Sequence, residues 1–158
     1  MSFKSIAFAT LTTLATALPA MAADIMVDDA YARSSAMSAK TGAAFMMIHN
    51  QGDTDDRLIG VSSPAAKVVQ LHTHKEDANG VMKMMHVEEG FALPAEGMIK
   101  MQRGGHHVMF MGISEPFEQG IMIPLTLTFE KAGEIEVEVP VDLERQPMQG
   151  GGHGKMSE

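Results

Sequence analysis

The sequence contains no cysteine and no tryptophan, and only one tyrosine and seven phenylalanines among its 158 residues. Lack of cysteine excludes a disulfide framework, a thiolate zinc or iron–sulfur site and a blue-copper centre within this sequence, because each needs cysteine sulfur. Methionine is abundant instead, with 16 residues. A thioether can bind metal without first losing a proton, and no disulfide can capture it. Methionine is therefore the sulfur donor available for a soft metal.

Long apolar runs are also scarce, and the one at the N-terminus is typical of a secretory signal. Lys4 precedes an apolar run over 6–18, and the segment closes on the small-residue motif Ala-Met-Ala at Ala22. These features predict a signal peptide over 1–22 that is cleaved after Ala22. A membrane anchor is the weaker alternative, because the run is short for a span and Pro19 follows it. We therefore expect a soluble periplasmic protein with no membrane span after signal cleavage.

The net charge argues against a nucleic-acid-binding protein, and the length indicates a single domain. Loss of Lys4 with the signal leaves 11 basic residues against 20 acidic ones, a net charge of −9. Such a chain is a poor partner for nucleic acid, which binds through clustered positive charge. The remaining length suits one domain with a single core. We predict a β-sandwich domain over 23–145 and a flexible, glycine-rich tail over 146–158.

Short apolar or alternating segments recur along the predicted domain, with turn signals between them and no sustained helical period. Two of them, 125–129 and 135–139, alternate around a glycine-containing turn and predict a hairpin. The spacing predicts an all-β fold of the Greek-key sandwich or barrel type. The expected strands are 25–33, 42–49, 57–62, 67–74, 81–87, 98–102, 107–113, 122–130 and 134–143.

The segment after the glycine pair at 104–105 carries the strongest chemical signal. On a strand, His107, Met109 and Met111 share one face while Val108 and Phe110 share the other. The second face is suited to a core, and the first offers nitrogen and soft sulfur. Among common biological metals this donor set favours copper, and Cu(I) in particular.

Two further segments present metal-binding side chains on one face. In 67–74, His72 and His74 point away from the apolar residues, and in 81–86 Met84 shares a face with the residues two positions before and after it. Each segment alone is better explained by an exposed histidine or a packed methionine. Together with the 107–111 segment they predict a shared metal site.

The order of these residues resembles that of the bacterial periplasmic copper chaperones of the PCuAC type. Their pattern is a histidine, a distant methionine and a His-x-Met pair, matched here by His72, Met84, and His107 with Met109. The likeness extends over about 30–141, with supporting matches at 50–58, 62–66, 71–74, 80–84, 93–95 and 107–112.

The resemblance implies a cupredoxin-like sandwich that holds one Cu(I) near its surface through His72, Met84, His107 and Met109. It also implies a carrier without catalytic turnover. The expected partners are the copper-bearing subunit of cytochrome oxidase and a thiol-bearing Sco-type protein.

One departure from the family pattern concerns Met84. Twenty-two residues separate Met84 from His107, one more than the family usually has. Met85 would restore the spacing, but it lies on the opposite face of its strand from Met84. We therefore predict Met84 as the ligand, with the extra residue in the loop near 88–90.

Auxiliary ligands are expected near the main site and in the tail. His74 shares the His72 face, while Met148, His153 and Met156 lie in the tail. The eight residues from Arg145 to His153 have a reach of about 16 Å as a glycine-rich coil. We expect the tail to supplement the site and to supply nitrogen for Cu(II); a merely disordered terminus is the alternative.

Other side chains receive structural interpretations. Three histidines are interpreted as structural. Two of them, His49 and His86, lack matching partners in the pattern, and His106 points with the core side of its strand or into the glycine turn. Met26, Met46, Met47 and Met122 are read as core residues that replace aromatics.

Two alternatives to a delivery protein remain at this point. A periplasmic copper buffer for tolerance would use the same site. A copper-dependent redox enzyme is the second alternative. Within that class, a copper monooxygenase that uses an N-terminal histidine is disfavoured, because cleavage after Ala22 exposes alanine or aspartate, whereas a copper-dependent reductase or oxidase stays open. No pair of acids is spaced as a general acid and base, and no serine nucleophile elbow is present.

Overall fold

The computed structural model describes residues 24–146, which form two packed antiparallel sheets without a helix. Strands account for most of this part of the chain, as the alternating pattern predicts. The ten strands are β1 (Ile25–Ser34), β2 (Thr41–Asn50), β3 (Asp56–Ser62), β4 (Ala66–Glu76), β5 (Met82–His86), β6 (Phe91–Leu93), β7 (Met98–Met101), β8 (His107–Ile113), β9 (Met122–Phe129) and β10 (Gly133–Pro140).

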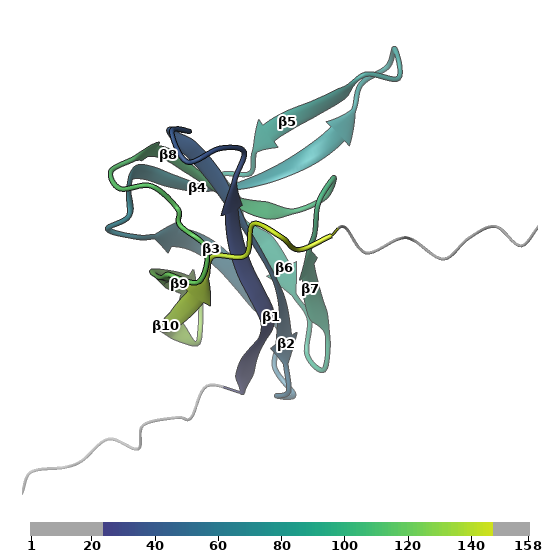
Figure 1. Cartoon of the computed structure of the whole chain (residues 1–158). Coiled ribbons are helices and arrows are strands. Elements are labelled where there is room, and N and C mark those ends of the chain that lie inside the picture. Colours follow the sequence, from purple (N-terminus) through teal and green to yellow (C-terminus); the bar gives the residue numbers. More distant parts are fainter. Residues whose placement is uncertain (1–23, 147–158) are drawn as a thin grey trace, which may run out of the picture.

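The larger sheet runs β1-β2-β8-β4-β5, with β7 paired to the other half of β2, and the smaller sheet runs β10-β9-β3-β6 (Figure 1). Strands distant in the chain therefore become neighbours, above all β8 between β2 and β4. The all-β sandwich expected from the sequence is confirmed.

The core lies between the sheets and is built by alternation. In β9, the side chains of Ile123, Leu125, Leu127 and Phe129 are all buried, and the residues between them point outward. The predicted hairpin follows, because Phe129 pairs with Gly133 at the start of β10. Alternation thus assigns each strand one face toward the core.

The observed strands match the nine expected segments closely, with one omission. The three-residue β6 went unpredicted because a run this short has too little pattern to detect. Two of the methionines expected in the core are instead on the surface, since Met26 is 41% exposed and Met122 is 51% exposed. Met46, by contrast, is buried as expected, whereas Met47 is half-buried on the outer face of β2.

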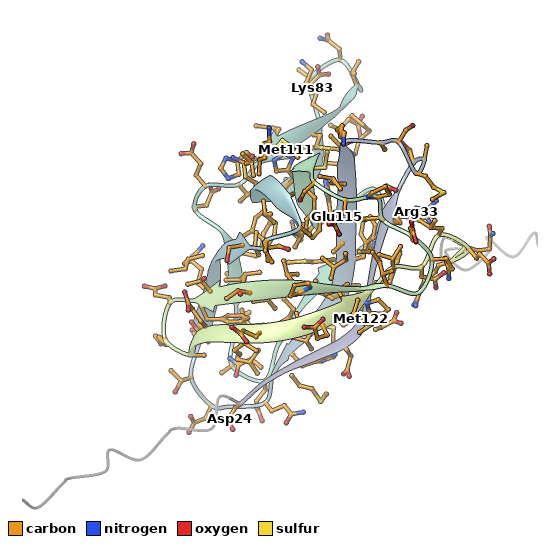
Figure 2. All side chains as sticks on the ribbon, turned by 60° about the vertical axis from the view of Figure 1, so that its left-hand side comes forward. Asp24, Arg33, Lys83, Met111, Glu115 and Met122 are labelled. Carbon is orange, nitrogen blue, oxygen red and sulfur yellow. The ribbon has the colours of Figure 1, made fainter. Side chains whose placement is uncertain are left out.

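The end of β4 and the whole of β5 form a hairpin that projects beyond the sandwich (Figure 1). All five residues of β5 are exposed. Lys83 lies near the outer end of this arm, and Met111 lies in the body below it (Figure 2). The hairpin therefore carries its side chains out over one end of the larger sheet.

After β10 the chain returns to the outer face of the larger sheet. The amide of Asp142 donates to the carbonyl of Ala32. The guanidinium of Arg145 stacks 4.4 Å above the ring of Tyr31 and pairs with Asp29. This brings residues up to Arg145 onto β1, the edge strand of the larger sheet.

Candidate metal centre

Three imidazoles stand in a row across the larger sheet. His72 on β4 pairs directly with His107 on β8 and with His86 on β5. The ring centre of His72 is 5.9 Å from that of His107 and 5.7 Å from that of His86. Directly paired residues of an antiparallel sheet share a face. All three rings therefore lie on the face opposite the core residues Leu71 and Val108.

The two expected thioethers flank this row on opposite sides. Met109 lies two residues along β8, opposite Gln70, and Met84 lies two residues along β5, opposite His74. Each methionine is thus displaced by about 6.6 Å along its strand from the imidazole row. A methionine side chain is long and flexible enough to lean back over that distance. The two thioethers would approach an ion above His72 and His107 from opposite directions.

His107 is the most buried member of the site, at 2% exposed. The rings of Phe45 and His74 pack near it, with ring centres 6.1 and 5.1 Å away. Its Nδ1 lies 3.0 Å from the carbonyl oxygen of Gly105. Because a carbonyl can only accept, Nδ1 carries the hydrogen and the Nε2 lone pair remains available to a metal.

His72 has the opposite tautomer. Its Nε2 lies 3.1 Å from the side-chain oxygen of Gln70, which accepts its hydrogen. The lone pair is then on Nδ1, which is buried and has no hydrogen-bond partner among residues 24–146. A buried unpaired nitrogen is unfavourable in a native protein unless another group satisfies it. A metal ion would do so.

Burial favours the neutral form of the His72 and His107 rings. Burial lowers the pKa of His72, and the neighbouring imidazoles of His107, His86 and His74 lower it further. Burial also lowers the pKa of His107 despite the opposing hydrogen bond to Gly105. Only a neutral imidazole has a lone pair for a metal. The site therefore favours the metal-binding form.

His74, expected as an auxiliary ligand, joins the same cluster. Its ring centre is 5.1 Å from that of His107, and its buried Nδ1 likewise has no partner among the described residues. It also lies opposite Met84 across the hairpin. His74 is therefore positioned between the thioether of β5 and the imidazole of β8.

The ring spacings suit a shared ion, but the imidazoles alone do not form a site. Two rings that bind one metal at about 2.0 Å, at tetrahedral angles, have centres roughly 5 Å apart. The spacing of His74 and His107 is close to this value, and that of His72 and His107 is somewhat larger. Within the described part of the chain, no three histidine or carboxylate side chains are arranged to hold a metal ion. Additional donors such as the thioethers are needed to complete the coordination.

A turn at the tip of the arm positions Met84. The carboxylate of Asp77 accepts hydrogen bonds from the amides of Asn79 and Val81 and pairs with Lys83 at 2.9 Å. The hydrogen bond from Lys83, together with these two amides, lowers the pKa of Asp77. The turn sets the register in which Met84 faces His74.

The same register separates the two candidate methionines. Met84 lies on the imidazole face of the hairpin, whereas Met85 pairs with Thr73 and lies on the other face. Strand periodicity predicts the same assignment of faces. Met84 is 46% exposed and Met85 is 49% exposed.

The other histidines fall into three different environments. His86, read as structural from the sequence, stands directly beside His72, which only the β4–β5 pairing reveals. His106 does have a structural environment: its ring stacks 4.2 Å from Phe91, and its Nδ1 lies 3.0 Å from the hydroxyl of Thr73. His49 lies elsewhere on the sheet, on β2. The tail residues Met148, His153 and Met156 are outside the described residues.

Comparison with known proteins identifies the family. The family model described as "Putative lipoprotein LpqE-like" matches residues 25–141, which include the whole sandwich. The chain belongs to the LpqE-like family. A curated relative, "Putative lipoprotein Lxx21020" of Leifsonia xyli subsp. xyli, is 36% identical over 99 residues, which is 63% of this chain. The match spans 59% of that relative's length.

Solved structures similar to this LpqE-like chain include copper-binding domains. The copper-bound PCuAC domain from PmoF2 is 28% identical, covers 75% of this chain and 92% of its own, and has a TM-score of 0.61. Apo-DR1885 from Deinococcus radiodurans is 26% identical, covers 92% of this chain and all of its own, and has a TM-score of 0.60. CuI-DR1885 from the same organism is 29% identical over 80% of each chain, with a TM-score of 0.55. The chain is therefore PCuAC-like in fold.

Helices long and apolar enough to cross a membrane are absent from residues 24–146.

Proposed function

We propose that this LpqE-like protein is a periplasmic copper carrier that binds Cu(I) through His72, Met84, His107 and Met109. The observation that carries the proposal is the direct pairing of His72 with His107, each with one ring nitrogen left free for a metal. Copper-bound structures of similar domains support copper as the ion.

The donor set favours the monovalent ion. Two neutral imidazoles and two thioethers add no negative charge, and thioethers bind Cu(I) in preference to harder ions. Met84 is 46% exposed on a projecting arm, so a partner can reach the site. Exposed, exchangeable thioethers suit a carrier that passes its ion on. As cargo, the copper would move to a partner's thiolates by ligand exchange.

The recipient proposed for this cargo is the copper-bearing subunit of a respiratory cytochrome oxidase, with a Sco-type thiol protein as a further partner. This assignment follows the likeness to PCuAC domains. It also agrees with the absence of cysteine, because the carrier then holds copper more weakly than a thiolate acceptor would. Copper would consequently move in one direction.

The tail is proposed as an auxiliary arm for Cu(II). Arg145, which directly precedes the tail, stacks on Tyr31, whose ring lies 5.1 Å from Phe45, and Phe45 in turn neighbours His107. The tail therefore begins at a residue that is linked to His107 through the rings of Tyr31 and Phe45. A coil from Arg145 to His153 has a reach of about 16 Å, which would suffice.

Export is proposed from the signal pattern at 1–22, which lies outside the described residues. The relative from Leifsonia, described as a lipoprotein, supports a destination outside the cytoplasm. None of the 158 residues is cysteine, so a cysteine-linked lipid has no attachment point in this sequence. The periplasm is the compartment that this combination favours.

Anaerobic equilibrium dialysis tests the site. Wild type, Met109→Ala, His107→Ala and the control Met122→Ala are dialysed against Cu(I) buffered by a chelator. Met122 is an exposed methionine on the smaller sheet, paired with Pro140. We expect Met122→Ala to bind like wild type and the two site variants to bind at least about tenfold more weakly. Equal binding by all four proteins contradicts the site.

A transfer assay separates delivery from storage. Cu(I)-loaded protein is mixed with the soluble copper domain of an oxidase subunit in the presence of a competing Cu(I) chelator. A carrier loads the oxidase domain with copper faster than the copper–chelator complex does without the protein. A buffer for tolerance leaves the rate of loading unchanged. Turnover of a redox substrate by the copper-loaded protein would instead indicate an enzyme.

A further inference from the structure

A second histidine between two methionines lies at the other end of the larger sheet. His49 on β2 pairs directly with Met26 on β1 and with Met98 on β7. The three side chains therefore share one face, one from each of three adjacent strands. The next row in register, Val27, Ile48 and Ile99, faces the core, so the methionines and His49 point outward.

The exposure of these methionines is unusual for residues that only fill space. Met26 is 41% exposed and Met98 is 51% exposed, while the His49 side chain between them is 29% exposed. Directly paired residues have Cβ atoms about 5 Å apart, so both thioethers can lean over the imidazole. One imidazole between two thioethers is a donor set for a soft monovalent cation.

A carboxylate lies near the ring of His49. The Oδ2 atom of Asp28 lies 3.7 Å from Nε2 of His49. No hydrogen bond joins the two side chains at this distance, so the neutral ring of His49 can turn its free lone pair toward a metal. Asp28 also lies in one row with Met47 and Lys100. A third thioether, that of Met47, therefore adjoins the site.

The two sites are too far apart to share one ion. Phe45, which neighbours His107, and His49 are separated by four residues of β2, or about 13 Å. Figure 2 shows Asp24, which precedes β1, and Met111 of β8 at opposite ends of the body. An ion on His49 would be independent of one on His72 and His107.

We propose that Met26, His49 and Met98 form a second binding site for Cu(I). The site goes beyond the proposed carrier centre and stands without it, because the two share no residue. The protein would then hold a copper ion at each end of its larger sheet. The second ion, on a flat and exposed surface with three principal donors, is expected to bind more weakly than the first.

Methionine methyl spectroscopy of the full chain tests this site. Protein carrying ¹³C-methyl methionine is titrated anaerobically with Cu(I) supplied as its acetonitrile complex. We expect the methyl signals of Met84 and Met109 to shift with the first equivalent and those of Met26 and Met98 with the second. His49→Ala and Met98→Leu should weaken binding of the second equivalent by about tenfold or more, and Met122→Leu should leave it unchanged.

The outcomes are distinct for the two sites. If the methyl signals of Met26 and Met98 do not shift at excess Cu(I), the second site is overturned. The same holds if the signals of Met148 and Met156 in the tail shift with the second ion instead. Shifts confined to Met26 and Met98 support the second site and contradict the carrier centre. Unchanged binding of the second ion by both His49→Ala and Met98→Leu also overturns the proposal.

Discussion

His72 and His107 lie directly opposite each other across β4 and β8, with ring centres 5.9 Å apart, although three other strands separate them in the chain. In each ring one nitrogen is hydrogen-bonded to a neighbouring oxygen, and the other nitrogen is available to a metal. The backbone pairing of two strands thus brings two of the four proposed ligands together. The other two proposed ligands are the long, flexible side chains of Met84 and Met109.

The first prediction distinguishes the two adjacent methionines of the arm. Met84→Leu should weaken Cu(I) binding at least about tenfold, because it removes a thioether from the imidazole face. Met85→Leu should have little effect, since Met85 faces away beside Thr73. Competition with a Cu(I) chelator measures both. A larger loss in Met85→Leu would mean that the arm pairs in a register shifted by one residue.

A second prediction concerns the tail. A chain ending at Gln146 retains the whole described sandwich and lacks Met148, His153 and Met156. We expect it to bind Cu(I) with nearly the affinity of the full chain and to lose Cu(II) binding, because His153 would supply nitrogen to the divalent ion. Copper titrations in each oxidation state measure this. Unchanged Cu(II) binding would remove the auxiliary role of the tail.

Alanine substitutions at Gly90 and Gly104 test how a close backbone approach affects the stability of the fold. Both have positive φ, but a Cβ on Gly90 would lie 2.0 Å from the carbonyl oxygen of Leu58, whereas one on Gly104 would meet nothing within 4 Å. Gly104→Ala should cost about 1 kcal/mol from backbone strain alone. Gly90→Ala should cost at least about 3 kcal/mol, because β3 must also move. Urea denaturation gives both values, and equal costs would contradict the close approach.

Acid stability should depend on Asp56. Burial alone would raise the pKa of Asp56, but hydrogen bonds from the backbone amides of Lys131, Arg57 and Ala132 outweigh it and lower that pKa. A lowered folded-state pKa stabilises the protein above the unfolded value of about 3.9, and this stabilisation is lost as pH falls through the folded value.

Asp56→Asn is the variant that tests this dependence. The variant should be less stable than wild type at pH 7, by on the order of 1 kcal/mol for each weakened hydrogen bond. Its stability should also fall less steeply than that of wild type as the pH drops below 4. Thermal unfolding across this range measures both effects. Parallel pH profiles for the two proteins would assign the acid sensitivity to other groups.

Much of the fold could be predicted locally. Alternation of apolar residues along β8 and β9 assigned core and outward faces correctly, because strand geometry repeats every two residues. The same alternation put His107 and Met109 on one face and separated Met84 from Met85. The methionines were harder to place: nothing in the local pattern around Met26 and Met122 distinguishes a packed thioether from an exposed one.

The amino-acid sequence by itself determined which side chains share a face within a strand, and through the absence of cysteine it limited sulfur donors to thioethers. Only the tertiary structure decided which strands are neighbours. It set His86 beside His72, and it set Met26 and Met98 on either side of His49. The physical reason is that period-two alternation is local, whereas strand pairing depends on backbone hydrogen bonds and core packing between segments far apart in the chain.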